Sequence, residues 1–184
     1  MLDVIAAQDA AALLYIQEYL RCGVGNIFLP LWSNLGNGGM VWIIAAVVML
    51  FFHKSRKTGA LALGGMGLNL IAVNLVLKRI VARPRPWLVV EGLNTLLRSG
   101  DPNSFPSGHT SAAFAFAAVV CMTCKAWWAK AAAVVAAVLM GWSRLYVGVH
   151  FPTDVMAGAL VGTACGFFGV KLYEKCLERR FPLK

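Results

Sequence analysis

The sequence contains a stretch of twenty residues without a charged side chain at positions 58–77, which reads TGALALGGMGLNLIAVNLVL. A helix of about twenty apolar residues crosses the hydrocarbon core of a bilayer once. Gly64, Gly65 and Gly67 lie within the stretch and permit the close approach of a neighbouring helix. The stretch therefore predicts a membrane-spanning helix that packs tightly against other helices.

The composition of the chain extends this prediction beyond one helix. Hydrophobic residues account for 59% of the 184 residues and charged residues for 14%, whereas soluble proteins contain about 45–50% apolar residues. We expect a single domain over residues 1–184 with an all-α fold, a polytopic bundle of transmembrane helices. The five spans expected from the apolar stretches cover residues 39–52, 58–77, 109–124, 126–142 and 152–173.

Residues 1–21 predict an additional N-terminal amphipathic helix. Apolar side chains such as Val4 and Leu13 recur there at helical spacing, but Asp9 and Glu18 interrupt the stretch. This pattern is typical of a helix that lies in the membrane interface. A sixth span is the alternative.

The positive charge of the chain indicates how the bundle is oriented. There are 17 Lys and Arg against 8 Asp and Glu, for a net charge of +9 at pH 7. In a soluble protein this excess would suggest nucleic acid, but here the cations flank apolar stretches, so we expect no nucleic-acid partner. Ten cations fall on one side, against four on the other once three are assigned to the chemistry below. The positive-inside rule makes the first side cytoplasmic and places residues 78–108 and 143–151 on the outer side of the plasma membrane.

Three polar clusters are expected on this outer side. They are KRIVARPRP at residues 78–86, PSGH at residues 106–109, and a third cluster formed by Ser143, Arg144, His150 and Asp154. Each has an ordinary explanation, because cations anchor spans at the interface, Pro-Ser-Gly begins a helix, and a lone histidine is often structural. If the three clusters were unrelated, we would not expect the residue types of one catalytic mechanism to fall together on one face. Together the clusters therefore predict an anion site.

The residue types in these clusters suit a phosphate group. The backbone N–H groups at Ser107 and Gly108 precede a predicted helix, whose N-terminus attracts anions, and the Ser107 hydroxyl adds a donor. Lys78, Arg85 and Arg144 can donate charge-assisted hydrogen bonds to the non-bridging oxygens. We expect these five residues to bind the phosphate of the substrate.

Two histidines and an aspartate complete the expected site. Pro152 fits the first position of a helix, which places Asp154 in its first turn, from where the carboxylate can reach back to His150. A carboxylate on one imidazole nitrogen fixes the tautomer and leaves the other nitrogen free to attack phosphorus. His109, at the mouth of the same site, is positioned to protonate the leaving oxygen.

The three clusters resemble the motifs of the type 2 phosphatidic acid phosphatase family, which also includes the vanadium haloperoxidases. The family pattern is Lys, six residues, Arg-Pro; then Pro-Ser-Gly-His; then Ser-Arg, five residues, His, three residues and Asp. Residues 78–154 match it at every defining position. The resemblance implies a phosphohistidine on His150, activation by Asp154, acid catalysis by His109 and phosphate binding by the five residues named above. It also implies that no metal or other cofactor is required.

The number and spacing of the possible ligands also argue against a metal site. Apart from Asp154, the outer connections offer only Glu91 and Asp101 as carboxylates, too few for a two-metal centre. Cys121 and Cys124 form a C-x-x-C motif without a second pair or a nearby histidine. We therefore interpret them as small packing residues.

The expected function is that of a lipid phosphatase in the plasma membrane. Small bacterial members of the family with this architecture resemble undecaprenyl diphosphate phosphatases, which release phosphate from the carrier lipid of cell-wall synthesis. A phosphatidylglycerophosphate or phosphatidic acid phosphatase would use the same residues, and so would a phosphotransferase in which a hydroxyl replaces water. Vanadate-dependent halide oxidation and a non-catalytic lipid-binding or scrambling protein are the remaining alternatives. Neither the lipid nor the oligomeric state follows from the sequence.

Three further predictions concern residues near the clusters. Arg83 is a candidate for a secondary phosphate contact. Residues 87–97 either line an entrance for the lipid or rest at the interface, where tryptophan is common. Asn69 and Asn74 are expected to form hydrogen bonds between helices rather than to touch substrate.

Overall fold

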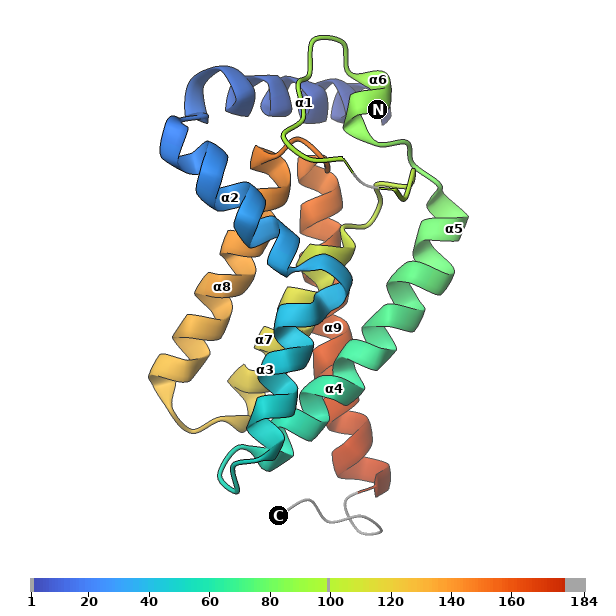
Figure 1. Cartoon of the computed structure of the whole chain (residues 1–184). Coiled ribbons are helices and arrows are strands. Elements are labelled where there is room, and N and C mark those ends of the chain that lie inside the picture. The colour runs from blue at the N-terminus through green and yellow to red at the C-terminus, as the bar shows by residue number, and fades with distance from the viewer. Residues whose placement is uncertain (1, 99, 178–184) are drawn as a thin grey trace.

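The computed structural model describes residues 2–98 and 100–177, and this part of the chain is helical, without a named β-strand (Figure 1). Seven helices exceed ten residues: α1 (Leu2–Tyr15), α2 (Gly23–Leu35), α3 (Met40–Leu50), α4 (Arg56–Leu70), α7 (Gly108–Thr123), α8 (Trp127–Tyr146) and α9 (Pro152–Leu172). Two short helices, α5 (Lys78–Val81) and α6 (Pro86–Val89), lie in the connection between α4 and α7. The segment Ile71–Leu77 is π-helical and continues α4 into α5.

Helix α7 forms the centre of the bundle and contacts α4, α8 and α9 (Figure 1). Its sequence is rich in alanine, which favours a helix and presents a flat surface to its neighbours. Helix α9 comes so close that a Cβ on Gly162 would lie 2.1 Å from the backbone oxygen of Ser111. Gly65 of α4 meets Gly166 of α9 in the same way, with 3.3 Å from its added Cβ to the Gly166 Cα. The predicted close approach at Gly65 is therefore confirmed, whereas Gly64 and Gly67 face open space.

The described residues form two helices that are long and apolar enough to cross a membrane, Arg56–Val81 and Pro152–Cys176. They correspond to two of the five predicted spans. The predicted span 39–52 is the second half of a pair, Gly23–Leu35 and Asn37–Leu50, that bends by 52° and makes a third span if counted as one. The predicted spans 109–124 and 126–142 form α7 and α8, but length and composition do not establish them as membrane crossings.

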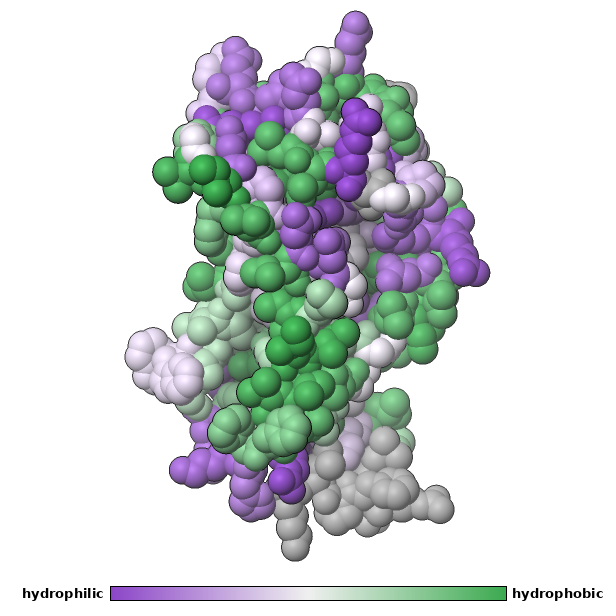
Figure 2. Space-filling view, in the orientation of Figure 1, coloured by the Kyte–Doolittle hydropathy of each residue, from purple (hydrophilic) through white to green (hydrophobic). Residues whose placement is uncertain are grey.

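The surface agrees with a membrane protein. In Figure 2, apolar side chains gather over the middle of the visible face, and hydrophilic side chains gather toward its two ends. Large apolar side chains remain exposed on several helices, including Leu31, Ile44, Val135 and Leu160. Exposed apolar side chains in such numbers are the expected exterior of a bundle that has lipid as its solvent.

Helix α1 runs across one end of the bundle rather than along it (Figure 1). It buries Asp9 and Leu13 against the bundle and leaves Val4 and Tyr15 exposed. The segment that follows is tied to the loop after α6, because the Gln17 side chain donates to the carbonyl of Gly92 at 3.1 Å. This placement supports the interfacial alternative for residues 1–21 over a sixth span.

Candidate active site

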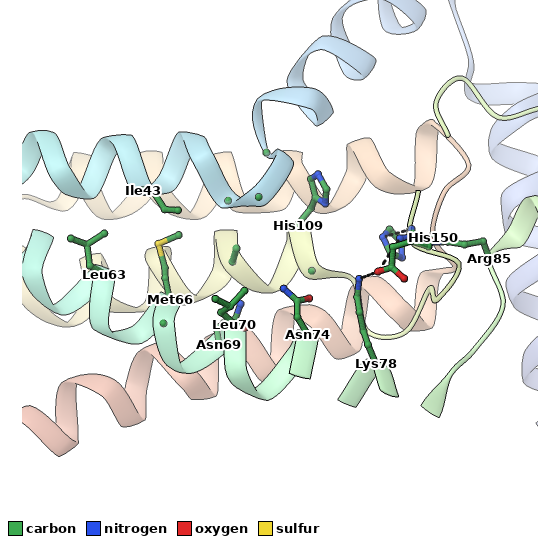
Figure 3. Close-up of a pocket in the computed structure, with 17 residues that line it drawn as sticks. Ile43, Leu63, Met66, Asn69, Leu70, Asn74, Lys78, Arg85, His109 and His150 are labelled. Carbon is green, nitrogen blue, oxygen red and sulfur yellow. Dashed lines mark hydrogen bonds and ion pairs between the residues drawn. The ribbon is translucent and has the colours of Figure 1, made fainter. Parts of the chain in front are cut away.

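The three polar clusters meet beside a cavity of about 430 Å³ at the end of the bundle that α1 covers (Figures 1 and 3). Five predicted site residues line it: Lys78, Arg85, Gly108, His109 and His150. They come from four segments, because Lys78 begins α5, Arg85 precedes α6, Gly108 and His109 begin α7, and His150 precedes α9. Residues spread over 73 positions thus form one wall, as their motif spacing predicts.

The other three predicted residues, Ser107, Arg144 and Asp154, are buried and do not line the cavity. The backbone N–H of Ser107 donates to the carbonyl of Asp154 at 3.0 Å, and its hydroxyl accepts a hydrogen bond from Thr110 Oγ1 at 2.9 Å. Arg144 donates from Nη1 to the hydroxyl of Ser33 on α2. Ser107 and Arg144 thus stand behind the residues that line the cavity, and their expected phosphate contacts stay predictions.

The imidazole of His150 lies between an arginine and a carboxylate. Nε2 is 2.9 Å from Arg85 Nη1, and Nδ1 is 3.6 Å from Asp154 Oδ2. A guanidinium has donors but no acceptor, so the contact with Arg85 requires Nε2 to accept and places the proton of the neutral ring on Nδ1. The tautomer of His150 is thus the one that keeps the Nε2 lone pair on the cavity side.

The protonation of His150 follows from its surroundings. Its side chain is 1% exposed, and burial lowers its pKa well below the ordinary value of 6.5. The positive charges of Arg85, Arg144 and Lys78 lower the pKa further, because each disfavours a second cation nearby. The ring is therefore neutral at pH 7, the state in which a histidine can act as a nucleophile.

Asp101 is a residue of this site that the sequence did not assign to phosphate binding. Its carboxylate is bound by Lys78 Nζ, lies 4.0 Å from Arg85 Nη2, and accepts the backbone N–H of Asn103 at 2.9 Å. Burial raises the pKa of Asp101, but the hydrogen bonds from Lys78 and Asn103 outweigh it and the net pKa is lowered. The Asp101 carboxylate therefore pairs with Lys78 and Arg85, the cations that a phosphate would need. An acidic residue shortly after a basic motif was the only signal for it in the sequence.

His109 is held from the bend between α2 and α3. Its Nε2 is 2.9 Å from the side-chain oxygen of Asn37, which leaves Nδ1 outside this hydrogen bond. The bend forms at Gly38 and Gly39, which adopt φ of 60° and 73°, values that favour glycine. The sequence predicted a span that begins at residue 39, and nothing in it indicated that Asn37 contacts His109.

Arg83 is not among the residues that line the cavity, and the expected phosphate contact stays a prediction. It points behind His150, where Nη1 donates to Asp154 Oδ1 at 2.9 Å and Nη2 donates to Asp9 Oδ2 at 2.8 Å. Its guanidinium also lies over the ring of Phe151, 4.0 Å from the centroid. Carboxylates on two other helices therefore hold this cation.

The cavity continues from the histidines along the bundle between α3 and α4 (Figure 3). Apolar side chains line this far part, among them Ile43, Leu63, Met66 and Leu70. Asn69 donates to the hydroxyl of Ser111 on α7 at 3.2 Å, which confirms the predicted hydrogen bond between helices. Asn74 instead lines the cavity, with its side-chain oxygen 3.5 Å from the position of a Cβ on Gly108. Sequence reasoning missed this role.

Residues 87–97, the expected lipid entrance, do not line the cavity. Trp87 lies under the guanidinium of Arg85, with 5.5 Å from the Cζ to the ring centroid, and it is not among the lining residues. The apolar part of the cavity lies instead between α3 and α4. Within the described residues no group of three or more His, Cys, Asp or Glu side chains could hold a metal ion.

These features define a class of protein, a helical membrane protein in which Lys, Arg and His side chains line one cavity. Residues 58–178 match the model of the PAP2 superfamily. The chain therefore belongs to the PAP2 superfamily.

Relatives within the family have names that refer to lipid phosphates. The chain is 32% identical to "Undecaprenyl-diphosphatase" of Sulfolobus acidocaldarius over 72% of this chain and 63% of that protein. It is 30% identical to "Undecaprenyl-diphosphatase BcrC" of Bacillus subtilis over 84% and 70%, and 31% identical to "Phosphatidylglycerophosphatase B" of the same organism over 94% and 84%. The chain thus spans less than two thirds of the length of the first of these relatives.

Two crystal structures share the fold. Aquifex aeolicus LpxE superposes with a TM-score of 0.76 at 30% identity and covers 86% of this chain and 92% of that one. The first transmembrane PAP2-type phosphatidylglycerolphosphate phosphatase from Bacillus subtilis gives a TM-score of 0.75 at 28% identity, over 97% and 89%. The likeness extends over most of the chain and supports its description as a membrane protein.

Proposed function

We propose that the protein is a metal-independent lipid phosphatase that releases phosphate through a phosphohistidine on His150. The observation that carries the proposal is the neutral imidazole of His150, whose Nε2 lone pair faces Arg85 at 2.9 Å beside an apolar cavity. A nucleophile, a cation cluster and an apolar stretch beside them are what transfer of a phosphoryl group from a lipid needs.

The first step transfers the phosphoryl group to the enzyme. The phosphate displaces the Asp101 carboxylate from Lys78 and draws Arg85 away from His150 Nε2 onto its own oxygens. Nε2 then forms a bond to phosphorus while the bond from phosphorus to the leaving oxygen breaks. His109, protonated once the negative substrate is bound among the cations, gives its proton to that oxygen.

The second step returns the enzyme to its starting state. A water molecule attacks the phosphohistidine, and His109 now accepts the proton of that water as a general base. The bond from phosphorus to Nε2 breaks and inorganic phosphate leaves. Asp154 stays ionised throughout and stabilises the positive charge that His150 carries in both steps.

The favoured substrate is undecaprenyl diphosphate, which would yield undecaprenyl phosphate. Two of the named relatives are undecaprenyl-diphosphatases. The apolar part of the cavity between α3 and α4 suits a hydrocarbon chain, since Ile43, Leu63 and Leu70 offer no polar partner. Phosphatidylglycerophosphate is the second candidate, because the relative named for that activity is matched over 94% of this chain. A phosphotransferase would differ only in the acceptor of the second step.

We assign the site to the outer side of the plasma membrane. The support is the bias of Lys and Arg toward residues 53–57 and the tail. In a variant that lacks the five native cysteines, single cysteines at Glu91 and Lys54, both exposed, serve as reporters. On intact cells a membrane-impermeant maleimide should label position 91 and not 54, and the reverse result would place the site in the cytoplasm.

The function is tested with the purified protein and a panel of lipids. Phosphate release is measured from undecaprenyl diphosphate, phosphatidylglycerophosphate and phosphatidic acid, with His150→Ala beside His53→Ala, a histidine in the turn between α3 and α4. We expect the diphosphate to be the best substrate, His150→Ala to be inactive and His53→Ala to be fully active. Activity should survive EDTA and be inhibited by vanadate, which imitates five-coordinate phosphorus. Loss with EDTA and recovery with Mg²⁺ would contradict the mechanism.

A further inference from the structure

A buried acid on the N-terminal helix lies behind the nucleophile. Asp9 of α1 is 3% exposed, and its carboxylate has no route to the cavity, whose lining residues do not include it. A buried carboxylate is costly unless it is paired and hydrogen-bonded. Its partners therefore indicate what it does.

The first partner of Asp9 is Arg83, which joins two carboxylates. Arg83 Nη2 donates to Asp9 Oδ2 at 2.8 Å, and Nη1 donates to Asp154 Oδ1 at 2.9 Å. Without Asp9 the guanidinium would keep Asp154, and the Thr153 hydroxyl at 2.7 Å from Nη1, but Nη2 would lose its carboxylate. The position of Arg83 is thus set from the side of α1.

The second partner of Asp9 is the first turn of α9. Asp9 Oδ1 accepts the backbone N–H of Thr153 at 3.1 Å, and Oδ2 accepts the hydroxyl of the same residue. A carboxylate at the N-terminus of a helix satisfies unpaired N–H groups and interacts favourably with the helix dipole. Asp9 therefore holds the turn of α9 that carries Asp154.

Both partners lead to the carboxylate of Asp154. Its Oδ1 is fixed by Arg83, and its Oδ2 accepts the N–H of Phe151 at 2.8 Å while facing His150 Nδ1 at 3.6 Å. At 3.6 Å this contact with Nδ1 is electrostatic and not a hydrogen bond, and a rotation of the carboxylate would change the distance from its charge to the ring. The carboxylate that faces His150 is thus held by a chain of contacts that begins on α1.

We propose that Asp9 is a positioning residue for the phosphatase reaction, acting through Arg83 and Thr153 on Asp154 and hence on His150. Helix α1 is then part of the framework of the active site and not only a surface element. The inference rests on the proposed function, since a positioning role requires that His150 be the nucleophile.

The test compares Asp9→Asn with Glu18→Gln, which removes an exposed carboxylate after the same helix. Turnover of undecaprenyl diphosphate and of an aryl phosphate is measured on protein from the monodisperse peak of size-exclusion chromatography, so misfolded protein does not count. We expect Asp9→Asn to lower kcat by about ten- to hundredfold, the loss typical of groups that orient catalytic ligands, with KM unchanged. Glu18→Gln should match the wild type.

A second background separates positioning from general stability. In Arg83→Gln, the further change Asp9→Asn should lower kcat by a smaller factor than it does in the wild type, because one of the two contacts that transmit its effect is already gone. The inference is wrong if Asp9→Asn behaves like Glu18→Gln, if its loss is undiminished beside Arg83→Gln, or if only the yield of monodisperse protein falls. A wild type that cleaves neither substrate would instead remove the proposed function, and the inference with it.

Discussion

The ion pairs on the two sides of His150 differ in how deeply they are buried. On the cavity side, Lys78 and Arg85 hold the side chain of Asp101, which is 39% exposed and which an incoming anion can replace. On the rear side, Asp154 and Asp9 are 0% and 3% exposed and share Arg83. Removing one partner of a buried ion pair leaves an uncompensated charge, whereas a partly exposed pair is easily exchanged. The comparison suggests that substrate rearranges the cavity side while the rear side stays fixed.

The largest effect is expected on the rear side, from Asp154→Asn. An amide cannot stabilise the positive charge that develops on His150, and it leaves Arg83 with one carboxylate. We expect kcat to fall by about 10⁴-fold, the loss known for the equivalent change in a catalytic triad. Single-turnover phosphorylation measures it, with Asp101→Asn as the control from the cavity side. A loss of less than tenfold would mean that the rear side does not govern the nucleophile.

On the cavity side the most damaging change should be His109→Ala. General acid catalysis contributes about 10²–10⁴-fold, and a good leaving group needs little of it. Turnover of the lipid diphosphate should fall by that range, and turnover of an aryl phosphate should fall far less. Equal losses on both substrates would leave His109 with a positioning role only.

A smaller effect, and a gain rather than a loss, is expected for Asp101→Asn. The substitution removes the internal anion that competes for Lys78 and Arg85. Because the pair is partly exposed, we expect inorganic phosphate and vanadate to inhibit roughly two- to fivefold more tightly, in line with the modest strength of such pairs. Inhibition constants in low and high salt measure this, with Glu91→Gln as a control. Weaker inhibition would show that Asp101 supports the anion site instead of occupying it.

The smallest effect is expected from a change of pH between 8 and 6.5. Burial and the surrounding cations lower the pKa of His150 below 6.5, so the reactive neutral form is retained at pH 6.5 and is lost only as the pH falls well below it. The rate of phosphohistidine formation should therefore be nearly constant from pH 8 to 6.5 and decline at lower pH. A half-maximal rate at or above pH 6.5 would contradict the surroundings assigned to His150.

The same comparison separates what the sequence could predict from what it could not. Lys78, Arg85, His109 and His150 line one cavity, as the spacing of the motifs indicates. Ser107 and Arg144 belong to the same motifs but have partners inside the bundle, Thr110 and Ser33, which no motif specifies.

The rear side lay beyond sequence reasoning because it depends on tertiary packing. Asp9 and Arg83 are 74 positions apart, and only the path of α1 across the bundle brings them together. The placement of Asn37 beside His109 depends in the same way on the 52° bend between α2 and α3. The long apolar helices could be predicted, because the local composition of Arg56–Val81 and Pro152–Cys176 indicates membrane spans.

The central claim is that His150 carries the phosphoryl group. The wild type is mixed with undecaprenyl diphosphate labelled with ³²P on the terminal phosphate, quenched in the steady state and mapped by peptide analysis under conditions that preserve phosphohistidine. The mechanism predicts label on the peptide that contains His150, lost in His150→Ala and retained in His53→Ala. Label on another residue, or turnover by His150→Ala at the wild-type rate, would contradict it.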